Sequence, residues 1–139
     1  KIALKNHDPE QAKQYLQEAI ALDPEYMEAI LVLMSIYSKE ESYDEIISLY
    51  EHISSQDFDW TALYPFVAEA YDKEEEFKKA YEMYSAAYVD FKEDSAFLEK
   101  YCYFLIEDGK QEQAKEIAQR LVALDPTEQQ YIELLERFE

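Results

Sequence analysis

The chain of 139 residues contains one glycine, one cysteine and four prolines. A fold of many β-strands needs glycine in its turns, so this composition disfavours such a fold and favours an all-helical chain with short loops. A single glycine also excludes a glycine-rich loop that could hold a phosphate group. Because Cys102 has no second cysteine to pair with, the composition fits a reducing compartment, and we expect a cytoplasmic protein.

Positive charge is scarce, with 13 basic against 32 acidic side chains and a net charge of −19. The acidic excess is spread along the chain and is not confined to a tail. Nucleic acids and anionic membranes require a cationic surface, so both are disfavoured as partners, and no apolar run is long enough to cross a bilayer. The acidity either keeps a Tyr- and Leu-rich protein soluble or attracts a basic partner.

Residues that bind metals or carry catalysis are not grouped in this sequence. His7 and His52 stand apart, without a second imidazole or a cysteine at ligand spacing, which argues against a zinc site. Carboxylates are frequent, but no calcium-binding loop occurs and nothing marks a pocket in which two carboxylates converge. We therefore expect no metal, no cofactor and no enzymatic activity.

A period of 34 residues runs through the chain. The segment 21–24, Ala-Leu-Asp-Pro, recurs at 123–126, which is 102 positions or three periods later. Three pairs of identical residues in the interval are each 34 apart: Tyr37 and Tyr71, Tyr50 and Tyr84, and Ala80 and Ala114. A fixed period of this length predicts a repeat architecture, in which each unit buries its apolar face by stacking on its neighbours.

Helix starts are predicted where an aspartate can cap the first turn. Three of these aspartates precede a proline that suits the first helical position: Asp8-Pro9, Asp23-Pro24 and Asp125-Pro126. The segment from Phe58 to Leu63 repeats this pattern without the proline. Each start is followed by apolar residues at helical spacing.

Short polar breaks at 38–42, 72–76 and 108–110 divide the units into pairs of helices. Gly109 occupies the position where a helix end adopts a left-handed conformation. Glu41 and Glu75 take the equivalent positions in the other two breaks. Those two turns are therefore predicted either to carry strain or to use another geometry.

Together these residues resemble the tetratricopeptide repeat (TPR) family in its bacterial type, and the resemblance covers essentially the whole chain. The family alternates large, small and aromatic residues at fixed positions within 34 residues. Residues 61–94 and 95–128 match well, at positions that include Tyr64, Ala68, Tyr71, Ala80, Tyr84, Ala87, Leu98, Tyr101, Cys102, Ala114, Ala118 and Pro126. Residues 27–60 match more loosely, because Met34 and Ile46 replace small residues, and we expect the two helices of that unit to lie further apart.

The resemblance implies an all-α fold, a right-handed TPR superhelix of about eight antiparallel helices in a single domain. Its units are predicted as a partial repeat at 1–26, full repeats at 27–60, 61–94 and 95–128, and a terminal or truncated helix at 129–139. Cys102 falls on a packing position, so a buried and unreactive thiol is expected. The partial first unit predicts a fragment of a longer protein.

The family implies a concave groove, lined by the first helix of each pair, that binds a peptide or a partner helix. Tyr103 lies two residues after Tyr101, so it points away from the packing face and toward the groove. The family's ligand-facing positions predict these partner-binding residues: Leu31, Ser35, Ser38, Phe66, Glu69, Asp72, Glu99, Tyr103 and Ile106. Glutamates outnumber lysines there, which disfavours a clamp for a partner's C-terminal carboxylate and favours a partner with basic and large apolar residues.

The resulting interpretation is a protein–protein interaction module or scaffold. Two alternatives stay open, a structural self-association module and a regulatory domain of a larger enzyme. The helix predicted after Pro9 has apolar residues on more than one side, and the partial unit lacks a cover for one of them. We therefore also expect self-association through residues 1–22.

Overall fold

The computed structural model describes residues 8–139. Within that range the chain forms eight α-helices and one short 3-10 helix, and no strand. The helices are α1 (Pro9–Leu22), α2 (Met27–Lys39), α3 (Tyr43–Ile53), η2 (Thr61–Leu63), α4 (Tyr64–Lys73), α5 (Phe77–Phe91), α6 (Ser95–Glu107), α7 (Gln111–Leu124) and α8 (Gln129–Glu136). The predicted all-α solenoid of about eight helices is confirmed.

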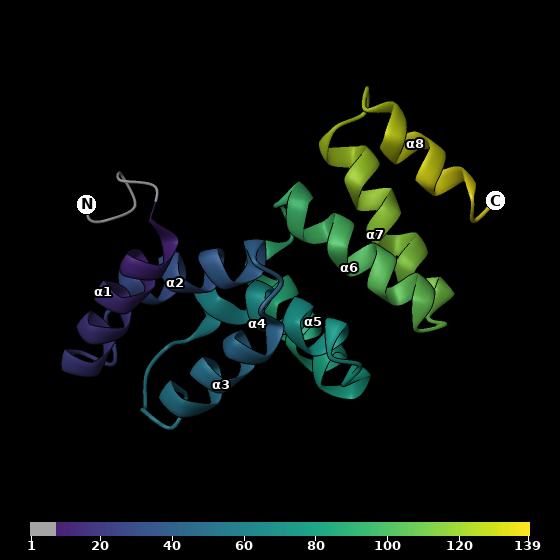
Figure 1. The fold of residues 1–139 in the computed structure, drawn as a ribbon. Coiled ribbons are helices and arrows are strands. Elements are labelled where there is room, and N and C mark those ends of the chain that lie inside the picture. Colours follow the sequence, from purple (N-terminus) through teal and green to yellow (C-terminus); the bar gives the residue numbers. More distant parts are fainter. Residues whose placement is uncertain (1–7) are drawn as a thin grey trace.

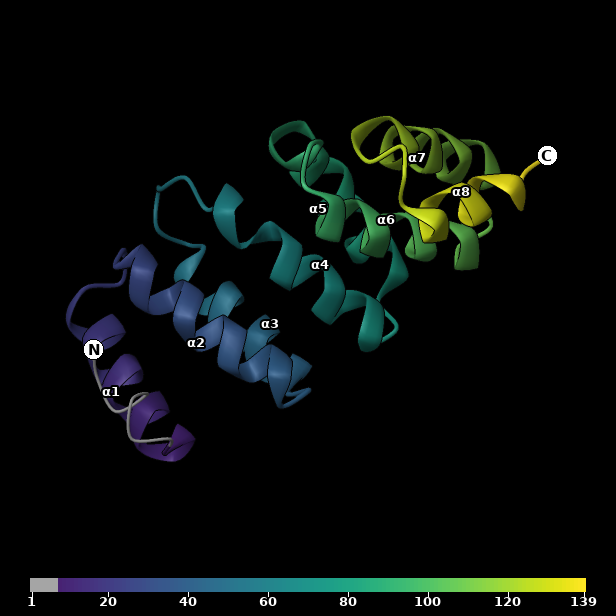
Figure 2. The ribbon, with the colours of Figure 1, turned by 90° about the horizontal axis from the view of Figure 1, so that it is seen from above.

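Neighbouring helices in the sequence pack side by side, so the molecule is an open array that runs from α1 at one end to α8 at the other (Figures 1 and 2). The pairs α2–α3, α4–α5 and α6–α7 are helical hairpins. The first helices of successive pairs also touch, because α2 contacts α4 and α4 contacts α6. This row of first helices positions the predicted groove.

Only one of the three Asp-Pro pairs starts a helix. The Asp8 carboxylate accepts a hydrogen bond of 3.2 Å from the Gln11 N–H and caps α1. The predictions at Asp23 and Asp125 are wrong, because α2 begins at Met27 and α8 begins at Gln129. The carbonyls of both aspartates accept from an N–H three residues later, so these Asp-Pro pairs form a turn before the helix.

The three hairpin turns share one geometry although only one contains glycine. The backbone φ angle is 59° at Glu41, 63° at Glu75 and 79° at Gly109. In each turn the next residue donates its N–H to a carbonyl five residues earlier, at 2.8, 2.8 and 2.9 Å, which is the Schellman helix ending. Of the two predicted outcomes for the glutamate turns, the left-handed conformation with its strain is the one observed.

The core follows the 34-residue period. Met34, Ala68 and Cys102 are fully buried at equivalent positions of successive hairpins, and so are Ile46, Ala80 and Ala114. Where both positions hold small residues, in α4–α5 and α6–α7, the two helices approach closely along their lengths. The α2 and α3 backbones make fewer close contacts, in agreement with the expectation that Met34 and Ile46 hold them apart.

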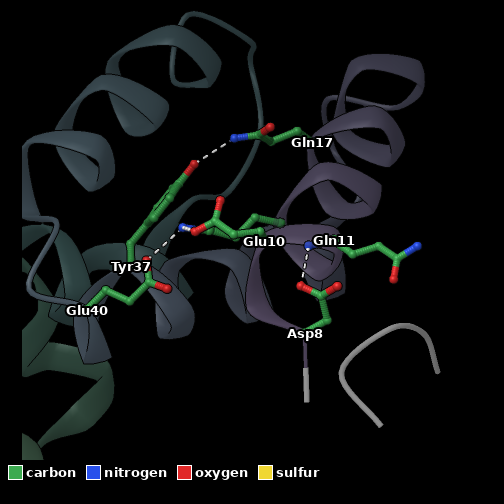
Figure 3. Close-up of polar contacts among 7 residues, drawn as sticks. Asp8, Glu10, Gln11, Gln17, Tyr37 and Glu40 are labelled. Atoms are coloured by element: carbon green, nitrogen blue, oxygen red, sulfur yellow. Dashed lines mark hydrogen bonds and ion pairs between the residues drawn. The ribbon is translucent and has the colours of Figure 1, made fainter. Parts of the chain in front are cut away.

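A hydrogen bond between helices also recurs with the period. Gln17 of α1 donates to the Tyr37 hydroxyl of α2 at 2.9 Å (Figure 3). One period later, the Tyr71 hydroxyl of α4 donates to Glu51 of α3 at 3.2 Å. Burial and the nearby Glu51 carboxylate raise the pKa of Tyr71 to about 12, so the donor stays protonated at neutral pH.

Candidate functional site

A small cavity lies where the first helices of the three hairpins, α2, α4 and α6, meet α5. Its volume is about 160 Å³. The lining residues come from α2, α4, α5 and α6 and from the loop before α6: Ser38, Pro65, Phe66, Glu69, Tyr84, Asp94, Ala96, Phe97 and Lys100. Of the predicted partner-binding residues, Ser38, Phe66 and Glu69 therefore meet in one cavity.

A cluster of aromatic rings forms the floor beneath this cavity. Tyr84 of α5 is stacked on Tyr101 of α6, with ring centroids 5.3 Å apart and an interplanar angle of 11°. Tyr84 also contacts Phe97 and Phe104, at centroid distances of 5.8 and 5.1 Å. These rings are buried and interlocked, so the floor is rigid, and burial raises the pKa of the Tyr84 hydroxyl.

One ion pair crosses the cavity from α6 to α4. The Lys100 ammonium lies 2.9 Å from the Glu69 carboxylate, and the Glu69 side chain is only 15% exposed. The pair cancels the positive charge that Lys100 brings to the cavity. Because Lys100 is half exposed, the pair contributes little stability, about 0–1 kcal/mol.

Asp72, one turn after Glu69 on α4, lines a second cavity of about 80 Å³ with Phe77, Phe104, Glu107 and Asp108. Burial is the main cause that raises the pKa of Asp72; the nearby Lys73 cation opposes this shift, whereas the carboxylates of Glu107, Glu69 and Asp108 add to it. This part of the groove is therefore an unfavourable place for negative charge. A cation brought by a partner would relieve that cost.

The remaining predicted residues do not line either cavity. Glu99 of α6 accepts a hydrogen bond from the Tyr131 hydroxyl of α8, which raises the pKa of Tyr131 to about 12. Tyr103 is 39% exposed on α6. Leu31 and Ile106 are half-buried against the core, and Ser35 is half-buried on α2.

Sequence reasoning missed several residues that shape the site. Phe97 and Phe104 are seven residues apart on α6, a spacing that places both on one face of a helix and could have identified them. Asp94 caps α6 by accepting from the Phe97 N–H at 3.2 Å, and both residues line the first cavity. Phe77 follows a polar break directly, and no sequence signal marked it.

The Cys102 thiol lies apart from both cavities. It is fully buried and donates to the Ala114 carbonyl at 3.4 Å. Burial raises its pKa to about 11, so the reactive thiolate is scarce at neutral pH, as the sequence predicted.

Metal sites and membrane spans are both absent from residues 8–139. No group of three or more histidine, cysteine or acidic side chains is arranged to hold a metal ion in that range. No helix formed by those residues combines the length and apolar character needed to cross a membrane.

Two family models match the sequence. Residues 3–69 match a model described as tetratricopeptide repeat. Residues 63–128 match a model described as YpiA-like, C-terminal tetratricopeptide repeats. Over 139 residues the chain is 36% identical to the TPR repeat-containing protein YpiA of Bacillus subtilis (strain 168), and it spans about a third (33%) of the length of that relative.

Solved structures with the same fold include three informative neighbours. MamA has a TM-score of 0.84 at 15% identity, covering 98% of this chain and 80% of MamA. YrrB, described as a TPR protein with an unusual peptide-binding site, has a TM-score of 0.80 at 17% identity, with coverage of 98% and 70%. The first TPR of Spaghetti (RPAP3), bound to the HSP90 peptide SRMEEVD, has a TM-score of 0.63 at 23% identity, with coverage of 78% and 91%. At these identities the likeness establishes the fold.

Proposed function

Because the chain belongs to the tetratricopeptide repeat family, we propose that its concave face binds a peptide or helix with basic and large apolar residues. The repeat fold and its peptide-binding neighbours support a protein-interaction module. The contact surface is the groove of α2, α4 and α6, with Leu31, Ser35, Ser38, Phe66, Glu69, Asp72, Glu99, Tyr103 and Ile106 as the proposed partner-binding residues.

The observation that carries this proposal is the cavity beside Phe66. A preformed recess with Phe66 at its side and buried aromatic rings below suits one large side chain of a partner, because little side-chain freedom has to be lost on binding. Anchors of this kind, held in a desolvated pocket, supply most of the binding energy in protein interfaces.

The charge of the groove favours a basic partner. Asp72 lies in a site that disfavours its own charge, beside Glu107 and Asp108. Lys100 is already paired with Glu69, so it offers a poor anchor for a partner's carboxylate. An acidic peptide would meet like charge along this face, whereas lysine or arginine would be attracted.

Titration of a labelled peptide tests the proposal. The probe is a short fluorescein-labelled peptide with several lysines around one phenylalanine, measured by anisotropy at about 50 and 300 mM salt. We expect binding that weakens as salt rises, because part of the attraction is screened Coulomb energy. Phe66→Ala should weaken binding mainly through faster dissociation, and Glu69→Lys should slow association and reduce the salt dependence.

The matched control is a peptide of the same length in which glutamates replace the lysines. It should bind more weakly to the unmodified chain at both salt concentrations. Preference for the acidic peptide, or equal affinity of the Phe66→Ala variant for the basic one, would contradict the proposal.

Self-association is a second candidate function, because α1 exposes apolar side chains. Tyr15 is 47% exposed and Leu22 is 88% exposed, whereas Ala12, Leu16 and Ile20 of the same helix are buried. The predicted association surface extends to residues 1–7, which lie outside the described residues. Sedimentation equilibrium decides this candidate: a mass that rises with concentration supports it, and a monomer at all concentrations excludes it.

A further inference from the structure

A groove separate from the concave face runs between α1 and α3. It consists of two adjacent cavities, of about 830 and 330 Å³, which share Gln17, Tyr37 and Glu45 as lining residues. Such volumes fall in the range of roughly 300–1,000 Å³ that is usual for ligand sites. On α2, Leu33 and Tyr37 line this groove, whereas Ser38 lines the concave cavity.

The packing of α3 explains why this space exists. The bulky Met34 and Ile46 separate α3 from α2, and α3 makes more close contacts with α4 than with α2. Helix α1 packs on the other side of α2. Displacement of α3 toward α4 therefore leaves a trough between α1 and α3, and Gln17 reaches across its wall to the Tyr37 hydroxyl (Figure 3).

The polarity of the groove changes along its length. The end near the C-terminus of α1 is lined mainly by apolar side chains, with Ser48 and His52 beside them; the apolar residues are Ile20, Ala21, Pro24, Leu33, Leu49 and Ile53. The end near the N-terminus of α1 has a polar and acidic lining, made by Asp8, Glu10, Gln11, Lys13, Gln14 and Glu45. An occupant must therefore be apolar at one end and polar at the other.

The polar end carries negative charge that its own cation does not cancel. The Lys13 ammonium pairs with Glu10 at 3.1 Å and with Glu40 at 2.8 Å, so it is already shared between two carboxylates. Glu10 and Glu40 are labelled in Figure 3. Both partners raise the pKa of Lys13 and keep it charged. Asp8 and Glu45 add two further carboxylates to the lining, so this end attracts a cation.

We propose that the α1–α3 groove is a second docking site, for an amphipathic helix of a protein partner that carries lysine or arginine at one end. Its apolar side chains would lie over Leu33 and Leu49, and its cations would face Asp8, Glu10 and Glu45. The 14 residues of α1 set the length of the groove, about 21 Å, which accommodates a helix of roughly three or four turns.

Photo-crosslinking with two synthetic helical peptides tests this site on the full chain. Both peptides carry the same leucine stripe and a benzophenone, and one has lysines at one end where the other has glutamates. We expect the lysine peptide to crosslink to α1 and α3 and to bind roughly tenfold more tightly than the glutamate peptide.

Two exposed positions provide variants that leave the core intact. Ser48→Arg places bulk and positive charge in the groove, and Glu45→Lys reverses the charge at its polar end. Each should weaken the lysine peptide about tenfold while circular dichroism stays unchanged. Phe66→Ala, in the concave site, should leave the crosslink to α1 and α3 unchanged, because Phe66 does not line this groove, and this separates the second site from the proposed function.

Three results would overturn the proposal. The first is crosslinking only to α2, α4 and α6 on the concave face. The second is unchanged binding by the folded Ser48→Arg and Glu45→Lys variants. The third is crosslinking of one copy of the chain to another through the same groove in the absence of peptide, because the occupant would then be a second copy.

Discussion

The α2–α3 and α4–α5 hairpins have the same turn, the same repeat period and different packing. Ile46 in α3 and Ala80 in α5 are equivalent residues, and both are fully buried. The large residue separates α2 from α3, whereas the alanine lets α4 and α5 approach closely. Hairpins with the same repeat pattern can therefore differ in the separation of their two helices, and the volume of the residue buried between those helices sets that separation.

The difference between the hairpins extends beyond the core. In α4–α5, close packing supports the Tyr84 ring and the rigid floor of the concave cavity. In α2–α3, the wider spacing leaves the groove between α1 and α3. Residues buried inside each hairpin thus influence where cavities form on its surface.

The largest expected effect comes from removing the residue that separates α2 from α3. Ile46→Ala should cost about 2–5 kcal/mol of stability, because it deletes buried methyl groups and leaves a cavity. Urea unfolding monitored by circular dichroism measures it. The neighbouring Ile47→Ala, at a half-buried position, should cost less. Equal costs for the two variants would contradict the assigned role of Ile46.

The reverse substitution tests the tightly packed hairpin. Ala80→Leu should overpack α4–α5 and cost about 1–3 kcal/mol, again measured as a urea midpoint. Ala86→Leu adds the same side chain at an exposed position of the same helix and should change stability by at most about 0.5 kcal/mol. An unchanged midpoint for Ala80→Leu would show that this helix crossing is misassigned.

Alkaline pH should distinguish the equivalent tyrosines of the two hairpins. Burial raises the pKa of Tyr84 in α5. Burial and the neighbouring Tyr64 raise the pKa of Tyr50 in α3, and Tyr84 is the more deeply buried of the two. Above pH 10, near the ordinary pKa of tyrosine, the unfolded chain loses the hydroxyl proton whereas the folded chain keeps it. The free energy of unfolding is therefore unaffected below about pH 10 and falls above it, by at most about 1.4 kcal/mol per pH unit for each such tyrosine.

Phenylalanine has no hydroxyl to ionise, so Tyr84→Phe should reduce the fall in stability above pH 10. The reduction should be larger for Tyr84→Phe than for Tyr50→Phe. Urea midpoints measured across pH 8 to about 11 for the two variants provide the comparison. A larger flattening for Tyr50→Phe would reverse the inferred order of burial.

The smallest effect concerns the strained hairpin turns, which the two pairs share. Glu75 has a φ of 63°, so Glu75→Gly should relieve a left-handed conformation and raise stability by up to about 1 kcal/mol. Glu74→Gly is the control, because Glu74 has a φ of −89° and gains nothing from glycine. Thermal unfolding of both variants measures the difference. A loss of stability in Glu75→Gly would show that the turn is not strained.

The fold was predictable because it depends on a period. Repeated residues such as Tyr37 and Tyr71 keep the 34-residue spacing recognisable even where other positions differ between repeats. The turns of the hairpins are predicted by polar residues between the apolar stripes. The helix starts were less predictable. Asp23 and Asp125 cap well in principle, yet both lie in a turn, because local capping signals do not specify how the next helix must pack.

The candidate site was predictable only in part. Ser38, Phe66 and Glu69 share a cavity because each lies on the exposed face of a first helix, which the period specifies. The spacing alone did not reveal that Glu99 would bond Tyr131 of α8, since that contact depends on the neighbouring helix. The α1–α3 groove also escaped prediction, because it results from the displacement of a whole helix.

The most direct test of the central claim is a map of backbone amide shifts in the ¹⁵N-labelled chain during titration with the basic, phenylalanine-bearing peptide. We expect shifts that cluster on α2, α4 and α6, with Phe66, Asp72 and Tyr103 among the residues affected. The glutamate-substituted peptide should leave these signals in place at the same concentration. Shifts absent from α4 and α6, or larger shifts with the acidic peptide, would contradict the claim that an acidic concave groove binds a basic partner.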